Sequence, residues 1–140
     1  MRPKLLTSPR STPLNLILIG ANGDVTSAVL NQLEAEGIQA DRRNLEPLFD
    51  LLERAAFGQL RYGRDVKIVK STLPQLLFQL RYSFTSQSGV VQGRVFCTEL
   101  LPNTIFLLGW FFKLAGNDSE ATRLHQTEAA RRALRESEKH

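Results

Sequence analysis

Arg81, Arg94 and Lys113 are each the single cation of a stretch that reads as an apolar strand, and the three stretches follow one another in the middle third of the chain. The guanidinium group of arginine is a planar fork of N–H donors that matches the oxygens of a phosphate, and lysine adds a compact positive charge. A charged group on a half-buried strand is costly unless a group of opposite sign meets it. These residues therefore predict a site for an anion, and their chemistry suits a phosphate.

The alternation of side chains in these strands indicates that Arg81 and Arg94 share one face of a sheet. Apolar and polar residues alternate over residues 76–84, which is typical of a strand with one buried face. A hairpin closed around residues 86–89 puts Arg81 opposite Arg94 or diagonal to it, and Lys113 can join the same face from the third strand. Because like charges directly opposite one another are destabilising, this arrangement predicts a bound anion or a nearby carboxylate.

The charges of the surrounding segment leave two interpretations open. From Arg61 to Lys113 there are seven basic and two acidic residues, so this segment holds more than the net charge of +4 of the whole chain. An RNA or phosphate site accounts for this surplus, and so does a solvated sheet face whose cations pair with acidic helices. Tyr62 and Tyr82 are the aromatic residues of this segment that suit stacking on a base or donation of a proton, although each also suits a core.

The composition sets broad limits. A chain of 140 residues with 42% hydrophobic residues is expected to form one domain with a buried core. The single Cys97 excludes an internal disulfide and fits a reducing cytoplasm, which is the expected location. The longest apolar run, residues 104–112, is far shorter than the ~20 residues that span a bilayer. Residues 1–13 lack the apolar core of a signal peptide and are expected to form a flexible arm before a single domain over residues 14–140.

Hydrophobic periodicity predicts an α+β fold. The expected elements are a strand, two helices, four strands and a helix, over residues 14–19, 25–36, 44–56 (or 41–56), 66–70, 75–84, 90–98, 104–113 and 119–138. In the second helix, Leu45, Leu48, Phe49 and Leu52 recur with the spacing of one buried face. Because the strands follow one another instead of alternating with helices, we expect a mainly antiparallel sheet of four or five strands.

The turn after the first expected strand matches a phosphate-binding motif only in part. A strand that ends at Gly20 and is followed by Gly23 and a helix is similar to the phosphate-binding turn of dinucleotide-binding folds, but Thr26 stands where the third glycine is expected. Such a fold also needs a second strand after the helix, with an acidic residue at its end, and here a second helix follows. We interpret the motif as a tight turn followed by a helix N-terminus.

Five short stretches carry a more extensive resemblance. They read VKIVK, LFQLRY, GRVFC, IFLLGWFFK and AARRAL, at residues 66–70, 77–82, 93–97, 105–113 and 129–134. In their order and spacing, over residues 14–134, they resemble the HigB-like, phage-associated branch of the RelE/HigB-like superfamily of toxin–antitoxin ribonucleases. The resemblance implies a RelE-like fold, in which an N-terminal strand and a helical hairpin pack on a mainly antiparallel sheet and a helix follows the last strand.

The resemblance also implies an activity and its residues. Members of this family are metal-independent endoribonucleases that cleave mRNA, usually at the ribosome, and a cognate antitoxin protein is their partner; no cofactor and no membrane are implied. The ribose 2′-hydroxyl attacks the adjacent phosphate, so the site needs a base, cations and an acid. Arg81 and Arg94 suit the phosphate, and Tyr82 suits the acid. Lys70 or Lys113 suits the base if neighbouring cations favour its neutral form. By position in the family pattern, the catalytic residues are Arg81, Arg94, Lys113 and Lys70. Three further residues of the basic segment are expected to bind RNA, namely Lys67, Arg64 and Tyr82.

The chain departs from the family pattern at three positions. Gln79 replaces a glutamate, Gly93 replaces a tyrosine, and Leu114 replaces the second of two lysines. Without the tyrosine and the second lysine, the site lacks two groups that can move protons. The alternative is therefore a weak or inactive module with a RelE fold that binds RNA or a protein partner, as a regulator associated with phage or defence.

Overall fold

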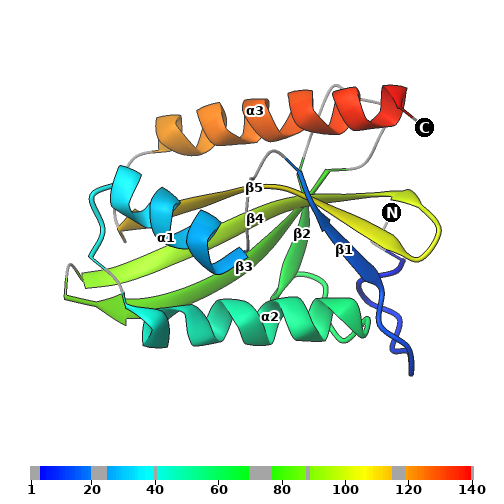
Figure 1. Ribbon diagram of the computed structural model, residues 1–140, viewed down its shortest axis with the longest axis horizontal. Coiled ribbons are helices and arrows are strands. Elements are labelled where there is room, and N and C mark those ends of the chain that lie inside the picture. The colour runs from blue at the N-terminus through cyan, green and yellow to red at the C-terminus, as the bar shows by residue number, and fades with distance from the viewer. Residues whose placement is uncertain are drawn as a thin grey trace.

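The computed structural model describes residues 4–19, 25–39, 41–69, 77–87, 89–114 and 119–139, with the side chains of the last segment from residue 127 onward. Its elements are β1 (Asn15–Leu18), α1 (Val25–Ala35), the 3-10 helix η1 (Arg42–Leu45), α2 (Glu46–Ala56), β2 (Val66–Val69), β3 (Leu77–Ser86), β4 (Gly89–Leu101), β5 (Thr104–Leu114) and α3 (Ser119–Glu138). The strands form one five-stranded sheet in the order β1-β5-β4-β3-β2, in which β1 runs parallel to β5 and the other neighbours are antiparallel. The predicted α+β class with a mainly antiparallel sheet and a C-terminal helix is confirmed (Figure 1).

The helices cover both faces of the sheet. α2 and α3 lie on opposite sides of it (Figure 1), and α1 shares the core of α2. Alternate side chains of a strand point to opposite faces, so each face has its own apolar cluster. The larger cluster, toward α1 and α2, includes Val29, Leu33, Leu48, Leu80, Val95 and Phe112. The smaller cluster, toward α3, consists of Leu77, Phe96, Phe106, Leu108, Phe111, Ala129 and Ala133.

Residues 4–13 differ from the predicted flexible arm, because they pack against the domain. The side chain of Leu6 is fully buried. The carboxylate of Glu99 on β4 accepts hydrogen bonds from the backbone N–H groups of Leu5 and Leu6 at 3.0 and 3.2 Å. The N–H group of Leu60 donates to the carbonyl of Leu6 at 3.0 Å. Leu6, with Leu5 partly buried beside it, therefore anchors this segment in the core.

The second predicted helix is divided into a 3-10 turn and an α-helix. Asp41 caps η1, since its carboxylate accepts from the backbone N–H groups of Arg43 and Asn44 and the Asn44 side chain accepts from the Asp41 N–H. Pro47 then occupies the first turn of α2, where a missing N–H leaves no intrahelical bond unmade. Phe49, which was assigned to the buried face of this helix, is 39% exposed.

Candidate functional site

Arg81 on β3 and Arg94 on β4 are direct cross-strand partners, which is one of the two arrangements that the hairpin predicts. Because cross-strand partners point to the same side of a sheet, the two guanidinium groups share one face. This face is the one turned away from α1 and α2, since the residues beside each arginine, Leu80 and Val95, belong to the core under those helices. The structure thus creates the pairing of like charges that the sequence pattern indicated.

Further polar residues lie on the same face. Lys113 on β5 is the partner of Gln92 on β4, and Lys67 on β2 is the partner of Gln79 on β3. Both glutamines are two residues from an arginine on their strand and therefore point to its side. We call the resulting set the basic face, and it consists of Lys67, Gln79, Arg81, Gln92, Arg94 and Lys113.

The guanidinium group of Arg94 is held by its own strand. Arg94 is only 8% exposed, and its Nη1 donates to the carbonyl of Gly93 at 2.8 Å while Nη2 donates to Oε1 of Gln92 at 3.4 Å. Burial lowers the pKa of Arg94, and the positive charge of Arg81 lowers it further. Since the surroundings disfavour this cation, a bound anion would stabilise it by restoring the local balance of charge.

The acidic residues of the basic segment are engaged elsewhere. Asp65 pairs with Arg54 of α2 at 3.1 Å and accepts from the backbone N–H of Arg61 at 2.9 Å. Glu99 accepts the N–H groups of the N-terminal segment. Within the described part of the chain, no ion pair includes Arg81 or Arg94. Among the described residues, no acidic side chain of a helix therefore neutralises Arg81 or Arg94.

Tyr82 lies on the opposite side of the sheet from the basic face, because it follows Arg81 directly in the strand. Its ring stacks with that of Phe84 and meets that of Phe112 edge-on, with 6.2 Å between the centroids in both cases. Its hydroxyl group is buried and finds no hydrogen-bond partner among the described residues. Burial raises the pKa of Tyr82 far above its ordinary value. The structure therefore does not bring Tyr82 to the face on which contact with RNA was predicted.

Gly93 is the cross-strand partner of Tyr82 and gives the ring its space. A Cβ atom added to Gly93 would lie 2.4 Å from two carbon atoms of the Tyr82 ring. A side chain at this position cannot share the site with Tyr82 unless the ring moves. The glycine at position 93 therefore has a packing reason in this chain.

The other predicted site residues lie around the two arginines or outside the described residues. Lys113 is half-buried near the end of β5, and Lys67 is exposed on β2. Arg64 is exposed in the turn that precedes β2. Lys70 lies outside the described residues. The basic face thus gathers two arginines and two lysines of the predicted set.

α3 crosses the same side of the sheet and limits the extent of the basic face. Nη1 of Arg132 donates to the carbonyl of Leu108 on β5 at 2.6 Å, and the same side chain pairs with Glu128 at 3.4 Å. The sequence does not reveal this contact, because Arg131 and Arg132 are equivalent in a polar helix until its orientation is known. Arg131 is exposed, whereas Arg132 helps to fix α3 on the sheet.

In the described ranges, His, Cys, Asp and Glu side chains do not gather in groups of three or more that could hold a metal ion. None of the described helices has the length and apolar character required to cross a bilayer.

The chain matches no protein-family model, no curated protein and no solved structure. The resemblance to RelE/HigB-like toxins therefore stays a hypothesis based on short stretches of sequence.

Proposed function

We propose that the basic face binds the phosphate backbone of RNA. The observation that carries the proposal is the direct pairing of Arg81 with Arg94, without an ion pair to either residue in the described part of the chain. Two adjacent guanidinium groups match a phosphate in charge and in hydrogen-bond geometry. Lys67 and Lys113 extend the positive charge across the neighbouring strands, as contact with successive phosphates requires.

The activity that we propose is that of a toxin of a type II toxin–antitoxin system, a metal-independent endoribonuclease that cleaves mRNA at the ribosome. A cognate antitoxin would cover the basic face. Arg81 and Arg94 would stabilise the charge that develops on the scissile phosphate during attack by the 2′-hydroxyl. Lys113, which shares their face, is the candidate for proton transfer among the described residues.

A second function, of a different class, is a non-catalytic module that regulates by binding RNA or a protein partner. The position of Tyr82 favours it, because a buried hydroxyl on the far side of the sheet cannot protonate a leaving group on the basic face. Leu114 stands at the position of a second lysine in the family pattern and cannot transfer a proton. The groups that bind phosphate are thus better supported than a full set of groups that cleave RNA.

Binding is tested by fluorescence anisotropy with a labelled single-stranded RNA at low salt. Arg81→Ala should weaken binding by about tenfold or more, because it removes a charge-assisted contact to phosphate. Arg43→Ala is the matched control, since Arg43 is exposed on η1, on the other side of the sheet. It should change affinity by less than about twofold. Equal losses in both variants, or no binding by the wild type, would refute the proposed RNA-binding face.

Cleavage is tested separately, by induced expression with growth measurement and mapping of mRNA ends. Ribosome-dependent cuts that disappear in Arg81→Ala support the toxin. Arg94→Lys adds a second test that keeps the charge at a buried position but removes the planar fork. RNA binding without cuts and without growth arrest supports the regulator instead.

A further inference from the structure

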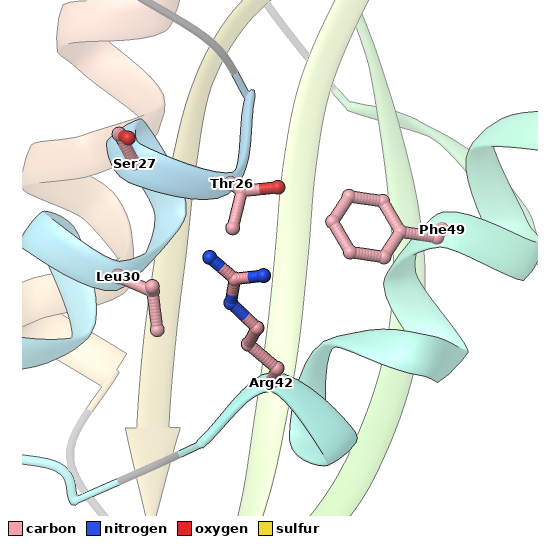
Figure 2. A pocket seen from close by; sticks show the side chains of 5 residues that line it. All are labelled: Thr26, Ser27, Leu30, Arg42 and Phe49. Carbon is pink, nitrogen blue, oxygen red and sulfur yellow. The ribbon is translucent and has the colours of Figure 1, made fainter.

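A cleft of about 360 Å³ opens between α1 and α2, on the side of the sheet opposite to the basic face. It is lined by Thr26, Ser27 and Leu30 of α1, Arg42 of η1 and Phe49 of α2 (Figure 2). The volume falls within the range of roughly 300–1,000 Å³ that is common for sites of small molecules.

Side chains from three elements converge in this cleft. Figure 2 shows the guanidinium group of Arg42 reaching from the start of η1 toward the side chain of Thr26, whose hydroxyl group points toward the ring of Phe49. The ring of Phe49 enters from the α2 side, and Leu30 lies on the α1 side. A few converging polar groups in a partly apolar cleft are the usual features of a site that orients a small ligand.

Arg42 is not engaged by the acidic residue beside it. The carboxylate of Asp41 accepts hydrogen bonds from the backbone N–H groups of Arg43 and Asn44. By contrast, Arg54 of α2 is held by two aspartates. Among the described residues no ion pair and no side-chain hydrogen bond includes Arg42, so within that part of the chain its N–H donors can meet water or a ligand in the cleft.

Phe49 is the exposed exception on the apolar side of α2. Leu48, Leu51 and Leu52 are buried, whereas the ring of Phe49 is 39% exposed and borders the cleft. An exposed aromatic ring offers a flat surface on which the base of a nucleotide can stack, with little dependence on which base it is. A guanidinium group and a hydroxyl group beside such a ring add donors for a phosphate.

We propose that this cleft binds one nucleotide, with its phosphate on Arg42 and Thr26 and its base against Phe49. The site is separate from the proposed RNA-binding face, because the two lie on opposite sides of the sheet. RNA binding at the basic face and nucleotide binding in the cleft can therefore each fail without the other. A free nucleoside monophosphate and the 5′-phosphorylated end of an RNA offer the same chemistry, and the experiment includes both.

The test is a titration of the isotope-labelled protein with UMP and AMP, in which NMR measures the chemical shifts of the backbone amides. Amides of the first turn of α1, of η1 and of the first turns of α2 should shift together and saturate. Uridine and inorganic phosphate should each bind at least about tenfold more weakly, because each supplies half of the contacts. Arg42→Ala and Phe49→Ala should each weaken UMP binding by about tenfold. Arg43→Ala removes the same charge one residue away and should change the affinity for UMP by less than about twofold.

Several outcomes would overturn the proposal. One is inorganic phosphate binding as tightly as UMP, and another is equal loss in Arg42→Ala and Arg43→Ala. Shifts confined to the basic face would overturn it as well. Both Arg42 and Phe49 are exposed, so the spectra of the variants should otherwise match that of the wild type. If a 5′-phosphorylated oligoribonucleotide shifts the cleft amides at lower concentration than UMP, the ligand is an RNA end; the reverse order assigns a free nucleotide.

Discussion

Arg81 and Arg94 face each other across the β3–β4 pair, and the charge of Arg81 contributes to the lowered pKa of Arg94. Opposed like charges destabilise a sheet, by roughly 0.2–1 kcal/mol. We therefore expect Arg81→Gln to raise the free energy of unfolding by about 0.5 kcal/mol at low salt while it weakens RNA binding. Urea unfolding at low and high salt measures this gain, which should shrink as salt screens the two charges.

The control for this prediction is Arg43→Gln, which removes one positive charge from an exposed position without an opposed cation. It should leave the free energy of unfolding nearly unchanged at both salt concentrations. A loss of stability in Arg81→Gln at low salt would show that the two guanidinium groups do not repel one another in the free protein.

Tyr82 gives a second prediction, because its buried hydroxyl group has no partner among the described residues. Tyr82→Phe removes that group and keeps the ring contacts with Phe84 and Phe112. We expect the free energy of unfolding to rise by about 1 kcal/mol, since an unsatisfied buried hydroxyl is costly. RNA binding and any cleavage should be unchanged. Loss of cleavage in this variant would assign Tyr82 a chemical role despite its position.

Gly93 gives a third prediction, from the lack of space beside the Tyr82 ring. Gly93→Ala introduces a Cβ atom 2.4 Å from that ring and should lower the free energy of unfolding by about 2 kcal/mol. Tyr82→Val should cost stability alone but should relieve the clash in the double variant. A thermodynamic cycle over the two single variants and the double variant measures the coupling. Strict additivity would contradict the contact.

Glu99 gives a prediction about pH. Burial raises the pKa of Glu99 above its ordinary value near 4.5, although the N–H groups of Leu5 and Leu6 and the charge of Lys4 oppose the rise. The folded state then binds a proton more readily than the unfolded state, so Glu99 reduces stability as the pH rises from about 4.5 through its folded-state pKa. Glu99→Gln keeps an oxygen acceptor and should therefore be more stable than the wild type at neutral pH, with the difference fading in acid.

The matched variant is Glu99→Ala, which removes the acceptor of two backbone N–H groups. It should speed amide hydrogen exchange at Leu5 and Leu6, because the N-terminal segment loses its link to β4. Urea unfolding as a function of pH checks the first variant, and exchange rates check the second. Unchanged exchange in Glu99→Ala would mean that burial of Leu6 alone holds this segment.

The basic face was largely predictable from the sequence, and the reason is local. The two-residue period over residues 76–84 and the turn at 86–89 place Arg81 and Arg94 on one face, opposite or diagonal to one another, and the structure pairs them directly. The same period already groups Tyr82 with the apolar side chains. Its predicted contact with RNA followed from its aromatic ring in the basic segment and from the family resemblance, whereas the observed position of Tyr82 follows the period.

The remaining features depend on residues that are distant in sequence. The bond from the Leu6 N–H to Glu99 and the contact of Arg132 with the Leu108 carbonyl have no local pattern. The cleft also depends on how α1 and α2 meet the sheet. The helical spacing of Phe49 predicts a buried residue, whereas its ring borders the cleft and is exposed. Such features need tertiary structure, because polarity and period do not show which members of a polar helix turn inward.

The parallel pairing of β1 with β5 has a consequence for synthesis of the chain. Asn15 is the partner of Thr104, so the first strand meets its neighbour only after both early helices and the long hairpin have been translated. Pairing across such a separation is slow to form. Until then β1 is an apolar strand without its partner, and Ile17 remains 41% exposed even in the finished fold. A chain that stalls before β5 therefore presents an open strand to chaperones and proteases.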